Sequence, residues 1–184
     1  MTKNFAGVGV KKQKKSGNDY KKRGEWVELK FMAEAAARNL SASKPYGDSE
    51  NFDVVVGRPR KFVGVQVKST ASLSRVKVGY ECKVRNGQQA YAAGSFDFLA
   101  VYIVPKNVWY IVPAKLIHGK RSIMLCPNLP VAKYEQYREA WKLLQEATGA
   151  KEELTLSPEK SAPPNRMEAR MMGAFNFVRK HWER

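Results

Sequence analysis

The chain has 184 residues, which is enough for one domain with a hydrophobic core and additional tails. Its 33 Lys and Arg residues outnumber its 17 Asp and Glu residues and give a formal net charge of +16. This surplus predicts a polyanionic partner, with nucleic acid first, although a merely soluble basic protein is the alternative. Cys82 and Cys126 form no CxxC pair, which argues against a zinc ribbon or disulfide scaffold and predicts buried, reduced thiols.

The sequence also bears on location. No apolar segment follows the basic N-terminus, so we expect no signal peptide. The longest apolar run, near residues 96–105, is too short and too interrupted to span a bilayer. We therefore expect a cytoplasmic, nucleoid-associated protein.

The first segment, residues 1–23, carries eight Lys and Arg residues and one Asp without a helical or strand period. This pattern predicts a flexible basic arm that lies along phosphates; a solvated tail without a role is the alternative. A helix is then expected from Gly24 to about residue 40. Its apolar positions at helical spacing are Trp26, Leu29, Met32, Ala33, Ala36 and Leu40.

Several strands follow this helix, and two amphipathic patterns close the chain. We expect a domain over residues 24–149, a Pro-rich linker over 150–165 and a C-terminal helix over 166–184. The order of elements predicts an α/β fold, a mixed sheet with helices on its faces. The expected elements are strands 52–57, 61–68 and one within 76–84, a helical turn within 87–94, a hairpin of 96–104 and 108–113, a helical turn at 114–117, a strand at 122–126 and a helix over 133–148.

Residues 61–68 alternate in a way that separates two faces of a strand. Its valines form one apolar face, whereas Gln66 and Lys68 lie on the other, next to Asp53 on the preceding strand. A lysine in that position needs solvent or an anion, because burial of its charge alone is costly. Glu25 and Glu28 lie three residues apart on the first helix and therefore share one of its faces.

These residues belong to four longer segments, "RGEWVE", "PYGDSENFDVVV", "VQVKST" and "SFDFLAVYIVPKNVWYIVPAKLI". Over roughly residues 22–120 the chain resembles the PD-(D/E)XK nuclease superfamily, in the variant with Gln-x-Lys in place of Glu-x-Lys. The likeness is to the group I intron homing endonuclease and Holliday-junction resolvase types. It implies a restriction-endonuclease-like mixed central sheet flanked by helices.

The resemblance also implies a metal site for Mg²⁺, with Mn²⁺ as a substitute. Asp53 would be the main ligand, Val67 would contribute its backbone carbonyl, and Gln66 would stand where the second acid usually stands. Glu28 best matches the helical acid of the resolvases, with Glu25 as the second choice. Such a set of oxygen donors suits a hard cation.

Lys68 would be the catalytic lysine, which orients or deprotonates the attacking water or offsets charge in the transition state. Gln66 is the departure from the family pattern, because an amide removes one negative charge from the metal site. The first hypothesis is therefore a Mg²⁺-dependent DNA endonuclease of homing, resolvase or restriction type. The alternative is a non-catalytic basic DNA-binding protein that retains the nuclease fold; a structural protein of nucleoid or ribosome is a weaker third.

The expected partner is duplex or branched DNA. The resemblance also implies a possible homodimer or higher oligomer. Each candidate DNA contact has an alternative: an unengaged tail, a solvated turn at the hairpin tip, or polar residues that end a strand. Asp97 is expected to cap the start of its strand rather than to serve the site. The candidate contacts are Lys11, Lys12, Lys14, Lys15, Lys21, Lys22 and Arg23 in the arm, Arg58, Arg60 and Lys61 at the hairpin tip, and Ser69 and Thr70 after the lysine.

Overall fold

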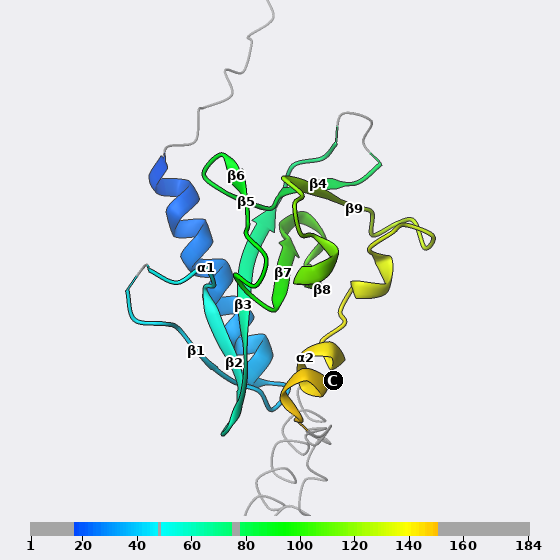
Figure 1. Cartoon of the computed structure of the whole chain (residues 1–184). Helices are drawn as coiled ribbons and strands as arrows, with labels where there is room; N and C mark the ends of the chain where they lie inside the picture. The colour runs from blue at the N-terminus through cyan, green and yellow to red at the C-terminus, as the bar shows by residue number, and fades with distance from the viewer. Residues whose placement is uncertain (1–16, 48, 75–77, 151–184) are drawn as a thin grey trace, which may run out of the picture. The chain divides into compact units, whose positions relative to one another are not determined.

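The computed structural model describes residues 17–47, 49–74 and 78–150 (Figure 1). The linker and C-terminal helix expected after residue 150 lie outside the described residues. Within these ranges the α-helices are α1 (Gly17–Ala36) and α2 (Lys142–Thr148), and the 3-10 turns are η1 (Val104–Lys106), η2 (Ala114–Leu116) and η3 (Glu135–Tyr137). The strands are β1 (Ser41–Ser43), β2 (Val54–Arg58), β3 (Lys61–Thr70), β4 (Tyr80–Lys83), β5 (Arg85–Asn86), β6 (Gln89–Ala90), β7 (Phe98–Ile103), β8 (Val108–Pro113) and β9 (Ser122–Leu125).

The central sheet is mixed and has the strand order β1-β2-β3-β7-β8. β3 pairs antiparallel with β2, where Val54 faces Val65, and parallel with β7, where Lys68 faces Val101. All other neighbours in this sheet are antiparallel. The expected strand pair around residues 58–61 and the hairpin after residue 96 are thus present, and the fold is the expected restriction-endonuclease-like α/β arrangement.

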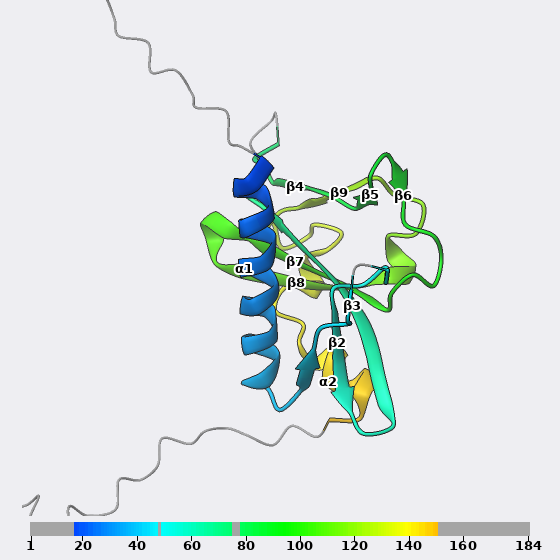
Figure 2. The same cartoon turned by 90° about the vertical axis from the view of Figure 1, so that its left-hand side faces the viewer.

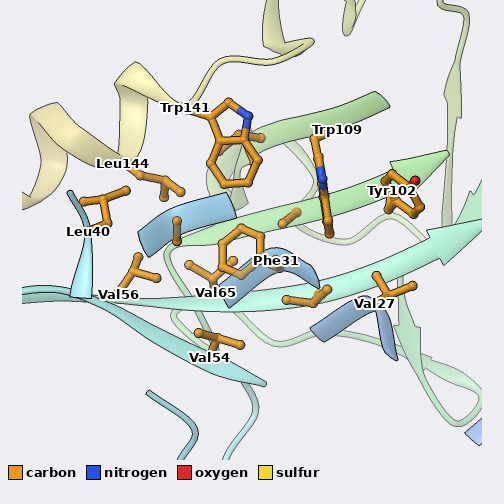
Figure 3. Close-up of a cluster of buried hydrophobic side chains, with 14 of the residues drawn as sticks. Val27, Phe31, Leu40, Val54, Val56, Val65, Tyr102, Trp109, Trp141 and Leu144 are labelled. Atoms are coloured by element: carbon orange, nitrogen blue, oxygen red, sulfur yellow. The ribbon is translucent and has the colours of Figure 1, made fainter. Parts of the chain in front are cut away.

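α1 covers one face of the sheet and buries Val27, Phe31 and Ala35, which recur every four residues (Figure 2). Phe31 packs against Trp109 and Trp141, and Val65 lies in the same cluster (Figure 3). This apolar cluster holds α1 and α2 against the strands that carry the polar residues described below.

The apolar face expected for this helix was wrong in part. Leu40 is buried and Met32 packs against the core, but Trp26 and Leu29 are 47% and 63% exposed, respectively. Val27 and Phe31 are buried instead. Apolar residues occur on more than one side of the helix, so spacing alone could not select the buried stripe; packing against the sheet selects it. The helix also begins at Gly17 rather than Gly24, so the last seven residues of the expected arm are helical.

The opposite face of the sheet packs under the small β4–β9 sheet. Leu99, Tyr110 and Leu125 are fully buried there. Cys82 and Cys126 are also buried and free, as expected. Both faces of β3 are therefore covered around Gln66, which is buried.

Two expected elements differ from the sequence prediction. The helix over 133–148 is broken into η3 and α2 by Glu139, which has a φ of 49°. The Glu139 carboxylate accepts hydrogen bonds from the Trp109 N–H at 2.7 Å and the Trp141 indole N–H at 2.8 Å, so tertiary contacts offset the local helical preference. The helical turn expected within 87–94 is instead the β5–β6 hairpin, whose tight turn contains Gly87 at φ 56°.

Candidate active site

The site is built at the edge of β3, beyond the first residue of β2. Asp53 immediately precedes β2 and stands opposite Gln66, one step past the Val54–Val65 pair. Its N–H donates to the Val65 carbonyl at 3.0 Å. One oxygen of its carboxylate, Oδ2, accepts hydrogen bonds from the Val67 N–H at 2.8 Å and from the Gln66 side-chain amide. Two hydrogen bonds from β3 therefore fix the carboxylate, and a third holds the Asp53 backbone.

The backbone of Val67 faces this same edge. The N–H and C=O of one strand residue point to the same side of the strand, and the N–H of Val67 points toward Asp53. The Val67 carbonyl is thus directed to the edge that β2 leaves uncovered, because β2 begins only at Val54. This is the oxygen that the resemblance assigns to a metal.

Lys68 lies two residues after Gln66 in β3. Its ammonium nitrogen is 5.6 Å from the centroid of the Tyr91 ring, within the range of a cation–π contact. Lys68, Gln66 and Asp53 line one cavity of about 470 Å³. The structure therefore brings together the aspartate, the amide and the lysine that the sequence pattern singled out.

α1 contributes Glu25 and Glu28 to the wall of the same cavity. Glu28 forms an ion pair with Lys44 at 2.5 Å, and this hydrogen bond raises the pKa of Lys44. Lys44 follows β1 and was not identified from the sequence, because nothing in the loop around it distinguishes it from any other surface lysine. The acid and its counter-ion lie beside Asp53.

Burial is the largest effect on Asp53 and raises the pKa of its carboxyl group. The hydrogen bond from Val67 opposes this shift, the negative charge of Glu28 adds to it, and Lys68 and Lys44 oppose it. The charge of Glu28 is among the largest influences on the pKa of Asp53.

The donor set around the cavity suits a hard divalent cation: two carboxylates, a side-chain amide oxygen and a main-chain carbonyl. Within the described ranges, no three His, Cys, Asp or Glu side chains converge as a metal-binding group. A cation would therefore have to use Gln66 or Val67 beside Asp53 and Glu28. The raised pKa of Asp53 agrees with such a site, since a bound cation would relieve the burial of negative charge.

Comparison with known proteins identifies the family. The sequence profile described as PD-(D/E)XK endonuclease matches residues 18–144, more than half of the chain. The chain belongs to the PD-(D/E)XK endonuclease family. No curated protein sequence matches it at a significant level.

Two solved structures are similar to this PD-(D/E)XK protein. The bacterial homing endonuclease I-Ssp6803I has 25% sequence identity and a TM-score of 0.62, and the match covers 73% of this chain and 98% of that one. Hjc, a Holliday junction resolvase from Archaeoglobus fulgidus, has 14% identity and a TM-score of 0.41, with 69% and 96% covered. The homing endonuclease type was named by the resemblance in the sequence.

A second, larger cavity of about 740 Å³ contains Asp97 and mostly apolar residues. The Asp97 Oδ2 atom accepts a hydrogen bond from the Gly64 N–H at 2.7 Å, and the Asp97 N–H donates to the Gly64 carbonyl at 2.8 Å. These contacts agree with the capping role expected for Asp97 at the start of β7. The larger cavity does not contain Asp53, Gln66 or Lys68.

The predicted DNA contacts are dispersed. Lys21 lines the site cavity, whereas the β2–β3 turn with Arg58, Arg60 and Lys61 lies at the far end of its hairpin, about 16 Å along the strand from Asp53 (Figures 1 and 2). This turn does not share the edge of the site, because the turn of a hairpin and its open strand ends lie at opposite ends of the two strands. Lys22 and Arg23 lie on α1, and Ser69 lies in β3; Lys11, Lys12, Lys14 and Lys15 lie outside the described residues.

Thr70 has a structural role. It is buried, and its hydroxyl donates to the Glu81 carbonyl at 2.7 Å and accepts from the Ser72 N–H at 3.2 Å. Its hydroxyl is therefore engaged within the protein and is not presented to a phosphate. No helix among the described residues has the length and apolar character that a membrane crossing requires.

Proposed function

We propose that this PD-(D/E)XK protein is a Mg²⁺-dependent DNA endonuclease that hydrolyses phosphodiester bonds. The observation that carries the proposal is the shared cavity of Asp53, Gln66, Lys68 and Glu28. Asp53, Glu28, Gln66 and the Val67 carbonyl would hold the metal, and Mn²⁺ would substitute for Mg²⁺. When bound, the ion would polarise the scissile phosphate and lower the pKa of an attacking water.

The residues of the chain have separate tasks. Lys68, whose ammonium group lies over Tyr91, would orient the water or offset negative charge that develops on the phosphate. Gln66 and the Val67 N–H hold the Asp53 carboxylate in one orientation. This fixed carboxylate is the kind of preorganised group that a hydrolytic site needs.

DNA is the proposed substrate because of the net charge of +16 and the similarity to a homing endonuclease. The basic residues on α1, with Lys21 at the cavity, support a phosphate contact beside the site. Homing, resolvase and restriction types of cleavage all remain within the proposal. A homodimer or higher oligomer would allow one copy to cut each strand of a duplex.

A second candidate is a non-catalytic DNA-binding protein that keeps the nuclease fold. Two contacts favour it: Gln66 donates to Asp53, and Lys44 neutralises Glu28, so both carboxylates already have partners without a metal. In this form the cavity would bind phosphate through its lysines but would not hydrolyse it.

Plasmid nicking with Mg²⁺, Mn²⁺ or EDTA separates the two candidates. For wild type we expect metal-dependent nicking, and for Lys68→Ala we expect a loss of at least about 100-fold with duplex binding largely retained. Lys83→Ala is the charge-matched control, because Lys83 is exposed on β4 and does not line the cavity; it should nick like wild type.

The enzyme proposal fails if wild type binds DNA but cuts neither plasmid nor branched junctions with either metal. It also fails if Lys68→Ala and Lys83→Ala lose the same amount of activity, because the loss would then reflect net charge.

A further inference from the structure

The β5–β6 hairpin is a short two-stranded ribbon that carries four polar side chains, Arg85, Asn86, Gln88 and Gln89. Asn86 pairs with Gln89, and Arg85 pairs with Ala90, across a turn of two residues. Residues 86–89 are exposed. The turn needs a positive φ at Gly87, so its geometry matches the tight hairpin type. The exposed side chains of the ribbon are all polar, so core packing does not explain their composition.

Two hydrogen bonds with Arg121 hold this hairpin in place, and a third lies within the hairpin. The Val84 N–H donates to the Arg121 carbonyl at 3.0 Å, and the Arg121 guanidinium donates to the Gln88 carbonyl at 2.9 Å. Within the turn, the Arg85 guanidinium donates to the Gln88 side-chain oxygen at 2.9 Å. The ribbon is therefore fixed to the residue before β9, and it enters any complex in a defined orientation.

The hairpin lies beside the proposed active site. Asn86 lines the same cavity as Asp53 and Lys68. Directly paired residues project from the same face of a ribbon, so Gln89 lies on the face that Asn86 turns toward the cavity. Among the described residues, neither of these two side-chain amides takes part in a hydrogen bond within the protein, so their donors and acceptors are available to a ligand.

We propose that the β5–β6 hairpin enters the major groove next to the scissile phosphate and reads base edges through Asn86 and Gln89. The major groove is about 12 Å wide and admits a two-stranded ribbon, and Asn and Gln amides make paired hydrogen bonds to N6 and N7 of adenine. The hairpin thus sets sequence preference for adenine close to the cleavage position. This inference rests on the proposed action on duplex DNA and extends it to a specificity determinant.

Selection from a randomised duplex library tests the proposal. Protein-bound DNA is recovered in EDTA and sequenced, so the result does not depend on cleavage. We expect wild type to enrich sites with adenine at one or two adjacent positions, and the double variant Asn86→Ala/Gln89→Ala to lose preference at those positions by roughly 10- to 100-fold. Preference elsewhere in the site should persist.

Asn128→Ala is the matched control, because Asn128 is an exposed loop residue that does not line the cavity. It should enrich the wild-type sites. The thermal midpoints of all variants should agree, since both hairpin side chains are exposed.

A gain of specificity gives a second test. In Gln89→Arg, a guanidinium that prefers O6 and N7 of guanine replaces the amide, so enrichment should move from adenine to guanine at one position. The proposal is overturned if wild type selects no sequence, if the double variant selects the wild-type sites, or if it loses affinity equally for all sequences. Failure of the nicking assay alone would leave this result standing.

Discussion

Two aspartates flank β3 in closely similar ways, yet only one belongs to a candidate active site. Asp53 precedes β2 and accepts a hydrogen bond from the Val67 N–H, and Asp97 precedes β7 and accepts one from the Gly64 N–H. Each carboxylate therefore ties the start of a neighbouring strand to β3. Backbone capping by itself does not distinguish a ligand from a structural acid.

The surroundings separate the two aspartates. Asp53 shares its cavity with Glu28, Gln66 and Lys68, whereas the cavity around Asp97 is lined mostly by apolar residues. Burial and a second carboxylate raise the pKa of Asp53. A candidate catalytic site at this sheet is thus recognised by a group of polar side chains that share a cavity. A single acid at the start of a strand does not predict function.

The largest expected difference between Asp53 and Asp97 is in nuclease activity. Asp53→Asn should lower metal-dependent nicking by at least about 100-fold, because the main proposed ligand loses its charge. Asp97→Asn is the matched control: it makes the same chemical change on the other edge of β3 and should retain wild-type nicking per folded molecule. Equal losses in initial rate would show that both acids only support the fold.

A smaller effect is expected from the counter-ion beside Asp53. Lys44→Gln removes the cation that neutralises Glu28, so Mn²⁺ should bind up to about five-fold more tightly, as expected for an exposed ion pair. Titration of the DNA-free protein, followed by calorimetry or by the Mn²⁺ resonance signal, measures this change. Lys106→Gln alters net charge equally at an exposed turn and should leave the affinity unchanged; weaker binding by Lys44→Gln would contradict the assignment.

The smallest expected effect is on thermal stability in the absence of metal. Substitution by Asn should change the thermal midpoint in opposite directions at Asp53 and Asp97. Because the folded-state pKa of Asp53 is raised, ionisation opposes folding, and this cost grows as pH rises above the ordinary value of 3.8. Asp53→Asn should therefore raise the thermal midpoint at pH 7 by about 2–4 °C, on the order of 1 kcal/mol, and this gain should vanish below about pH 3.

Asp97→Asn should instead lower the midpoint at pH 7, because it weakens a charge-assisted hydrogen bond to Gly64. Calorimetric melts of both variants across pH 3–7 in EDTA test the pair. A lower thermal midpoint for Asp53→Asn at pH 7 would contradict the raised pKa, because it would show that the folded protein stabilises the ionised carboxylate.

Strand periodicity was sufficient to place β2, β3, β7 and β8, because hydrophobic alternation and turn residues agree with the final packing there. The same reasoning failed for the helix expected over 133–148. The Glu139 carboxylate caps the Trp109 N–H from thirty residues away, and no local pattern reports such a contact. The buried side of α1 was also misjudged, since several apolar stripes compete in that helix.

The amino-acid sequence alone determined the class of fold, the spacing of Asp53 from Gln66 and Lys68, and the basic charge that predicts a nucleic-acid partner. These features depend on local order and composition, which a linear chain contains in full. Only the tertiary structure decided that the charge of Glu28 raises the pKa of Asp53 and that Lys44 forms an ion pair with Glu28. It also decided that the β5–β6 hairpin borders the cavity. The physical reason is that electrostatic interactions depend on distance and burial in three dimensions. Residues far apart in the chain come close together and become buried only when the sheet and helices pack.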